Sequence, residues 1–226
     1  MAAPITSKGI NLSAGRLFLI AKRAFERIQG VSVPTSGNQD DALVAIIFSA
    51  ASIEAFFNEL PEVPALIPEL LKQESPAVVT YIRLAEEIES SKGSVQLKFV
   101  LSFSILSGQP CDKGGKLYQD FALLVEARNG LMHMKPTEFL GEIKSDGTSE
   151  FEPAPIIKKF RSRNILDNSQ PDVPFPWHTR IATQAAAHWA CNTAADVVHS
   201  ILKVVPDGSS KLALTMLYGQ VFKRLD

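Results

Sequence analysis

The stretch DDALVAIIFSAASIEAFFNEL, from Asp40 to Leu60, decides the fold that this sequence predicts. Asn38 and the two aspartates at its start favour a helix N-terminus, and Pro61 directly after it favours a helix end. Apolar residues occupy almost the whole circumference of a helix over this range, which is typical of a helix that is buried on all sides. The sequence therefore predicts a central core helix that begins near Asn38 and stops at Pro61.

Further helices are predicted on both sides of this central helix. In the first of them, apolar residues recur at steps of three and four, which places them on one helix face. Residues 95–106 are apolar enough for a helix or a strand, and we favour a helix. The expected helices cover residues 12–28, 77–90, 95–106, 116–129, 177–205 and 211–225. We therefore expect a mainly α protein, an up-and-down helical bundle that forms a single domain over residues 1–226.

Residues 137–176 differ in character from the rest of the chain. Gly147 and the prolines at 153, 155, 171 and 174 interrupt regular helix, and residues 150–160 alternate in polarity as a strand does. We expect this segment to be an insertion into the bundle, either irregular or containing a short β-hairpin. The long helix expected after it, over about 177–205, is rich in alanine and so suited to close helix packing.

Composition excludes several classes of protein. Hydrophobic residues make up 46% of the chain, too many for a disordered protein, and the net charge of −1 excludes a surface coated with positive charge for nucleic acid. Cys111 and Cys191 lack the spacing of a disulfide framework or a metal site, and no signal peptide is recognisable. The longest apolar run, residues 42–48, is far shorter than the roughly 20 residues that cross a bilayer. We expect a soluble cytoplasmic protein with no membrane contact, no metal and no cofactor.

An arginine ends one predicted core stripe. Leu117, Phe121, Leu124 and Arg128 follow one another at steps of four, three and four, so they share one helix face. A guanidinium does not deprotonate in proteins and is costly to bury unpaired. Arg128 therefore needs an acidic or hydrogen-bonding partner.

The best partner within the chain lies on the central helix. Glu54 and Asn58 are one turn apart there and form a polar pair on an otherwise apolar surface. If the two helices pack side by side, Glu54 meets Arg128. Such a pair is either a buried structural salt bridge or part of a site with chemistry, and the two residues alone do not decide between these.

His133 follows Arg128 after four intervening residues. Asn129 and Gly130 between them resemble a helix cap, and if the helix continues instead, Arg128 and His133 lie one and a half turns apart. A helix C-terminus favours the imidazolium form and the nearby arginine opposes it. These opposed influences favour a histidine that exchanges a proton near neutral pH.

Two segments together resemble a known superfamily. EARNGLMH, residues 126–133, resembles the R-x4–6-H motif of the HEPN (higher eukaryotes and prokaryotes nucleotide-binding) superfamily, in the form of an arginine, a polar residue and then a histidine. SIEAFFNEL, residues 52–60, is similar to the early-helix signature of several HEPN groups, in which an acidic or amide residue faces the motif. The resemblance covers residues 42–60 and 116–136 and does not extend to residues 136–176.

The resemblance implies a helical bundle that pairs two-fold, so that both motifs share one cleft and cleave RNA without metal. Carried onto this chain, His133 would transfer a proton to or from the ribose 2′-OH or the leaving 5′-oxygen. Arg128 would stabilise the phosphorane-like transition state, and Asn129 would donate a hydrogen bond or orient His133. Glu54 and Asn58 would support these residues from behind. The products would be a 2′,3′-cyclic phosphate and a 5′-hydroxyl.

Two readings of the whole protein follow from this resemblance. The first is a homodimeric endoribonuclease that acts as a toxin or defence effector, with an antitoxin or regulatory protein as a further partner. The alternative is a non-catalytic HEPN-like module for binding or dimerisation, in which Arg128 and Glu54 form a structural ion pair.

The densest basic run of the chain is Lys158, Lys159, Arg161 and Arg163. It is either an RNA-phosphate contact beside the cleft or a solvated strand or loop, and we favour the solvated strand or loop.

Two histidines in the expected helix over 177–205 are candidate metal ligands. His188 and His199 project from nearly the same side of that helix, with Cys191 one turn from His188. A fourth ligand is missing, so we expect core or interface histidines and no metal. Nucleotide-binding loops, serine-hydrolase elbows and zinc-protease motifs are absent from the sequence.

Overall fold

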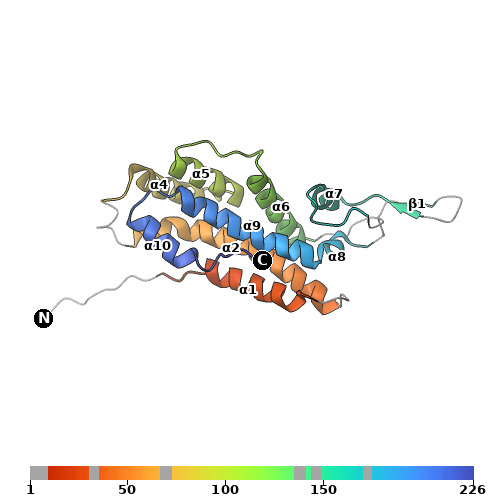
Figure 1. Cartoon of the computed structure of the whole chain (residues 1–226). Coiled ribbons are helices and arrows are strands. Elements are labelled where there is room, and N and C mark those ends of the chain that lie inside the picture. Colours follow the sequence, from red (N-terminus) through yellow and green to blue (C-terminus); the bar gives the residue numbers. More distant parts are fainter. Residues whose placement is uncertain (1–9, 31–35, 67–72, 135–140, 144–148, 170–174) are drawn as a thin grey trace.

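The predicted central helix is α2 (Ser36–Ala65), which lies in the middle of the molecule (Figure 1). The computed structural model describes residues 10–30, 36–66, 73–134, 141–143, 149–169 and 175–226. Within them α2 contacts α1 (Ala14–Ile28), α4 (Pro76–Ser90), α5 (Val95–Ser107), α6 (Lys116–Met132), α9 (Gln184–Val204) and α10 (Ser209–Tyr218). The prediction of a mainly α bundle around one apolar helix is confirmed.

The predicted end of this helix is wrong, because α2 continues through Pro61 and Pro64. Each proline removes one main-chain donor from a helix. Leu60, Val63 and Pro64 are nevertheless buried in the core. Burial of this last turn offsets the lost hydrogen bonds, an effect of tertiary packing that local sequence rules do not include.

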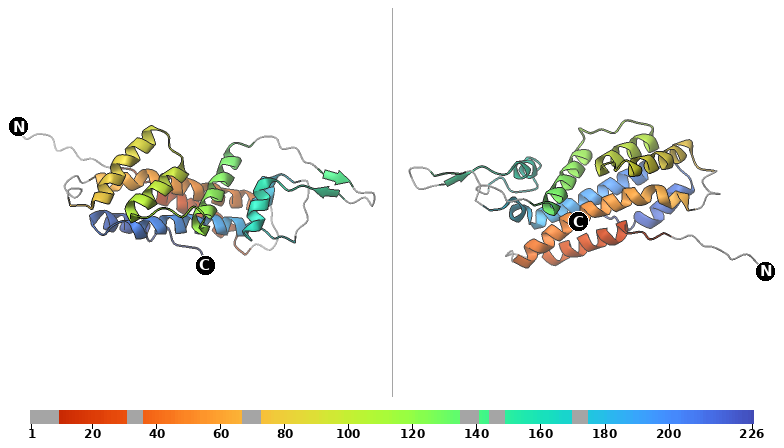
Figure 2. Two further views of the ribbon diagram at one scale, coloured as in Figure 1. Left: turned by 90° about the horizontal axis from the view of Figure 1, so that it is seen from above. Right: turned by 180° about the vertical axis from the view of Figure 1, so that it is seen from behind.

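By length and composition, α2 is also apolar enough to cross a membrane. More than half of its apolar window is buried inside the protein, and α1 and α9 run along it (Figure 2). Enclosure by neighbouring helices accounts for its apolar circumference.

Aromatic side chains fill the core around α2. Phe56 packs edge-on against Tyr218 of α10, with ring centroids 5.1 Å apart. Phe57 packs in the same way against Phe99 of α5, at 6.0 Å, and Phe121 of α6 lies beside both rings. Because aromatic pairs of this geometry stabilise beyond their buried area, they fix α5 and α6 against α2.

Buried carboxylates hold helix starts that are distant in sequence. Glu59 accepts hydrogen bonds from the backbone N–H of Ser13 at 2.5 Å and of Ala14 at 3.0 Å, and from the Tyr218 hydroxyl at 2.8 Å. A carboxylate at a helix N-terminus satisfies unpaired N–H groups and faces the positive end of the helix dipole. Glu59 therefore joins α1, α2 and α10 at one point.

The segment over residues 137–176 contains the expected hairpin and an unexpected helix. β1 (Gly141–Ile143) pairs antiparallel with β2 (Ser149–Phe151), and the two strands extend away from the bundle (Figures 1 and 2). The alternation in polarity over residues 150–160 suggested a strand, and this is wrong for most of the range, since Pro155–Ser162 is the helix α7. Its buried residues, Ile157 and Phe160, lie three apart on one helix face. Residues 137–140, 144–148 and 170–174 of this segment lie outside the described residues.

The single helix expected over 177–205 is two helices, α8 (Trp177–Ile181) and α9. Thr183 separates them, because its side chain accepts a hydrogen bond from the Ala186 N–H and so caps a new helix start. The helix expected over 211–225 is also shorter, since α10 ends at Tyr218. The residues after it form the C-terminal segment (residues 219–226), which begins with a turn over 219–221 and has no regular structure beyond it. This segment bonds to α9 through Asn192, whose amide contacts both backbone groups of Leu225.

Candidate functional site

Arg128 reaches the partner that the sequence predicts. Its Nη2 lies 2.8 Å from Oε2 of Glu54, which links α6 to α2. Phe121 and Leu124 of the same stripe are fully buried, and Leu117 packs against the core. The side chain of Arg128 is 30% exposed and that of Glu54 is 44% exposed, so the pair lies at the edge of the core. The reading of a buried salt bridge is therefore wrong, although the pairing itself is confirmed.

Asn129 holds the same guanidinium from the exposed side. Its Oδ1 accepts a hydrogen bond from Nη1 of Arg128 at 2.9 Å. An arginine carries five N–H donors, and Glu54 and Asn129 engage two of them. Within the described part of the chain the remaining donors have no other acceptor, so a further anionic group can bind to an arginine that is already oriented.

The helix runs past Asn129 and Gly130 to Met132, so the reading of these two residues as a cap is wrong. Gly130 is helical and lies under Trp177: a Cβ built on it would be 3.0 Å from two atoms of the indole ring. The residue has no side chain because α8 approaches α6 closely here. His133 takes the C-cap position instead, and its N–H bonds to the carbonyl of Asn129 at 3.1 Å.

His133 is exposed and follows the last residue of α6. The methionines on either side of it are exposed too, Met132 by 56% and Met134 by 57%. An imidazole buried against these methionines is thereby excluded. Two large apolar side chains thus lie in solvent on either side of the histidine.

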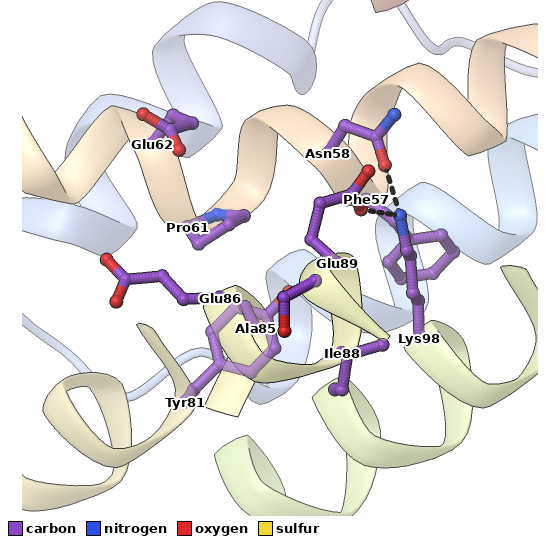
Figure 3. A pocket seen from close by; sticks show the side chains of 11 residues that line it. Phe57, Asn58, Pro61, Glu62, Tyr81, Ala85, Glu86, Ile88, Glu89 and Lys98 are labelled. Atoms are coloured by element: carbon purple, nitrogen blue, oxygen red, sulfur yellow. Dashed lines mark hydrogen bonds and ion pairs between the residues drawn. The ribbon is translucent and has the colours of Figure 1, made fainter. Parts of the chain in front are cut away.

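Asn58 does not join the arginine. Its Oδ1 accepts a hydrogen bond from Nζ of Lys98 at 2.6 Å, and the same ammonium pairs with Glu89 (Figure 3). The prediction that Asn58 supports the site around Arg128 is therefore wrong, because one helical turn brings it opposite α5 rather than α6. Lys98 was not among the predicted residues, although a single lysine among the apolar residues 95–106 itself indicates a fixed partner.

The basic run lies on and just after α7, so its reading as a strand or loop is wrong. Lys159 pairs with both carboxylate oxygens of Glu126 at 2.7 Å, and Arg163 donates to Asp120 at 2.7 Å. Lys158 pairs with Glu152, and Arg161 is engaged as well. Glu126 and Asp120 belong to α6, so these charges hold α7 against the helix that carries the site. The RNA-contact reading of the run stays a prediction, and RNA would have to compete with these ion pairs.

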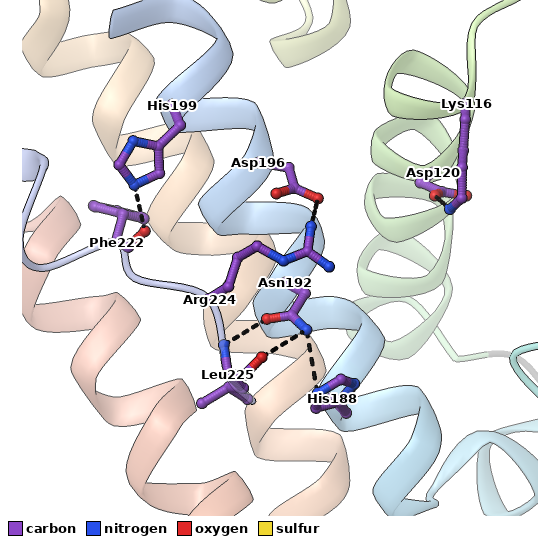
Figure 4. A network of polar contacts seen from close by, with 9 residues as sticks. All are labelled: Lys116, Asp120, His188, Asn192, Asp196, His199, Phe222, Arg224 and Leu225. Atoms are coloured by element: carbon purple, nitrogen blue, oxygen red, sulfur yellow. Dashed lines mark hydrogen bonds and ion pairs between the residues drawn. The ribbon is translucent and has the colours of Figure 1, made fainter.

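The two histidines of α9 bind protein groups (Figure 4). His199 donates from Nε2 to the carbonyl of Phe222 at 2.8 Å, and His188 contacts the amide of Asn192 at 3.2 Å. Burial raises the pKa of the Cys191 thiol to about 11, which keeps it protonated. Among the residues that the structure describes, no group of three histidine, cysteine or acidic side chains can hold a metal ion.

The fold and site thus define a helical bundle with an oriented, half-exposed arginine and an exposed histidine at the end of α6. A scan of protein-family models and searches of curated proteins and of solved structures find no match to this chain.

Proposed function

We propose that this protein is a metal-independent endoribonuclease of the HEPN type, with Arg128, Asn129 and His133 as its catalytic residues. The observation that carries the proposal is the state of Arg128, which two acceptors fix in place and whose side chain remains 30% exposed. An arginine oriented in this way suits phosphate, because its planar fork matches two phosphate oxygens.

In the proposed reaction the 2′-OH of one nucleotide attacks the adjacent phosphorus and the 5′-oxygen of the next nucleotide leaves. His133 removes the proton of the attacking hydroxyl or delivers one to the leaving oxygen. Arg128 binds the non-bridging oxygens, on which negative charge grows in the transition state. The atoms balance without metal or water in this step: one P–O bond forms, one breaks, and a 2′,3′-cyclic phosphate and a 5′-hydroxyl remain.

A single chain presents one arginine and one histidine on an open surface. We propose a homodimer in which two such sites share one cleft, with RNA bound between them. The exposed Met132 and Met134 support contact with another chain at this end of α6. The accompanying proposal is a cytoplasmic toxin or defence effector that an antitoxin or regulatory protein restrains.

The second candidate is a non-catalytic HEPN-like module for binding or dimerisation. The ion pair between Arg128 and Glu54 favours it, since such a pair also links two helices in a protein without chemistry. The two candidates differ in one measurable respect. Only the endoribonuclease needs His133.

Cleavage of labelled single-stranded RNA by the purified protein, in the presence of EDTA, tests the proposal. We expect His133→Ala to lower the cleavage rate at least about a hundredfold, the usual contribution of a general acid or base. Mass spectrometry of the products should show the cyclic phosphate. Arg27→Ala is the matched control, because Arg27 also links two helices through an ion pair, with Asp41, and does not belong to the proposed site. Wild-type rates in His133→Ala would refute the proposal.

A further inference from the structure

A cavity of about 440 Å³ opens between α2, α4 and α5 (Figure 3), and neither Arg128 nor His133 lines it. Its lining is apolar at Phe57, Tyr81, Ala85 and Ile88. Cavities that bind small molecules have volumes of roughly 300–1,000 Å³ and are mostly apolar with a few polar groups. The size and floor of this cavity are therefore those of a small-molecule site.

Two polar residues of the cavity, Asn58 and Glu62, belong to a regular feature of α2. Glu54, Asn58 and Glu62 recur at steps of four and form the α2 polar strip on one helix face. Glu54 binds Arg128, Asn58 binds Lys98, and Glu62 lines the cavity. The strip therefore ends in a carboxylate that faces the cavity.

The charge of the lining is unbalanced. Among the described residues that line the cavity, the one cation is Lys98; it is only 13% exposed and already has Asn58 and Glu89 as acceptors. Glu62 and Glu86 also line the cavity, and no hydrogen bond or ion pair engages either carboxylate within the described residues. Glu62 and Glu86 are both exposed to solvent, and beside the apolar floor they have no counter-charge among the described residues.

The excess of negative charge in the lining indicates which class of ligand the cavity can bind. Phosphates, nucleic acid and other anions meet like charge here, which is destabilising. A metal ion needs at least three converging ligands, and no such group of acidic, histidine or cysteine side chains exists in the described part of the chain. An organic cation satisfies both the free carboxylates and the apolar floor.

We propose that this cavity binds a small organic amine. Its ammonium group pairs with Glu62 and Glu86, which Figure 3 shows on the side of the cavity opposite Lys98, and its carbon skeleton covers Tyr81, Ala85 and Ile88. The site is separate from the proposed endoribonuclease site and does not depend on it.

The test uses phenethylamine as the probe and the full chain as the protein. Titration followed by methyl NMR should show shifts at Ile88 and Ala85 that saturate with the amine. The double variant Glu62→Gln/Glu86→Gln should bind about tenfold more weakly, because it removes two solvent-exposed charge contacts, each of modest strength. Phenylethanol, which has the same ring and no charge, should also bind about tenfold more weakly than the amine.

Glu87→Gln is the matched control. It removes the same charge from the same helix, and Glu87 is exposed and does not line the cavity. We expect it to bind the amine as the wild type does. Equal affinity of wild type and double variant, shifts confined to other parts of the protein, or no saturation at millimolar amine would each overturn the proposal. Thermal unfolding of each variant establishes that it is folded.

Discussion

Replacing Arg128 with alanine separates a structural role from a catalytic one, because the structure predicts a small effect on stability. Ion pairs between partly exposed side chains contribute about 0.2–1 kcal/mol, and Arg128 and Glu54 are 30% and 44% exposed. A loss of 1 kcal/mol lowers Tm by roughly 2–4 °C in a protein of this size. We therefore expect Arg128→Ala to unfold no more than about 4 °C below the wild type.

The same substitution has a large expected effect on RNA cleavage. Removing one donor from a preorganised anion site lowers kcat by roughly 10²–10³, which is several times the stability term in free energy. Glu54→Gln should lower the rate less, since it loosens Arg128 and leaves the guanidinium present. The double variant Arg128→Ala/Glu54→Gln should cleave RNA no more slowly than Arg128→Ala alone, because Glu54 acts only through the arginine.

Two assays carry this comparison. Urea unfolding of the wild type, both single variants and the double variant gives the coupling free energy of the pair, and single-turnover cleavage gives the rates. Arg27→Ala should show a similarly small stability loss and an unchanged rate. A drop in Tm of about 10 °C or more in Arg128→Ala, together with a wild-type protein that cuts no RNA, would refute the catalytic reasoning and favour the structural module.

Three further substitutions test the rest of the structure. Glu59→Gln should lower the free energy of unfolding by about 2–4 kcal/mol, because a neutral amide is a weaker acceptor than a carboxylate for two helix N–H groups and the Tyr218 hydroxyl. Urea unfolding measures this loss, and a loss below about 1 kcal/mol would contradict the prediction. Burial raises the pKa of Tyr81 to about 12, so the neutral phenol stabilises the fold below pH ~10 and this contribution is lost as the pH rises towards 12; Tyr81→Phe should lack that alkaline loss in pH-dependent unfolding. Asn192→Ala should loosen the chain around Leu225, seen as faster hydrogen exchange at Leu225, and unchanged protection there would mean that Asn192 does not hold it.

The pairing of Arg128 with Glu54 could be predicted because it follows from the helix face on which each of the two side chains lies. Step sizes of three and four place side chains on one face, and an arginine on a core face needs an acceptor. The apolar circumference of residues 40–60 identifies that helix as central for the same reason. Both arguments use helix geometry alone, and both hold in the structure.

Features that depend on distant contacts could not be predicted in this way. In the sequence, Glu59 is an ordinary polar residue near a helix end. Only the structure shows that it accepts hydrogen bonds from α1 and α10. Pro61 reads as a helix stop until the burial of the following turn is known. Lys159 and Arg163 read as solvated charge, yet their partners lie more than thirty residues away on α6. In each case the deciding energy is tertiary and exceeds the local preference.

The α2 polar strip explains why the two proposed sites can be tested apart. Glu54 and Glu62 are eight residues apart, which is about 12 Å along a helix at 1.5 Å per residue. Substitutions at this separation with no shared partner are usually additive. Glu62→Gln should therefore weaken amine binding and leave RNA cleavage unchanged, and Glu54→Gln should do the reverse. Asn58 lies between them and binds Lys98, so this hydrogen bond and α2 itself are two routes by which the sites could be coupled. If Glu62→Gln did slow cleavage, Asn58→Ala would tell these routes apart, because it removes the hydrogen bond and keeps the helix.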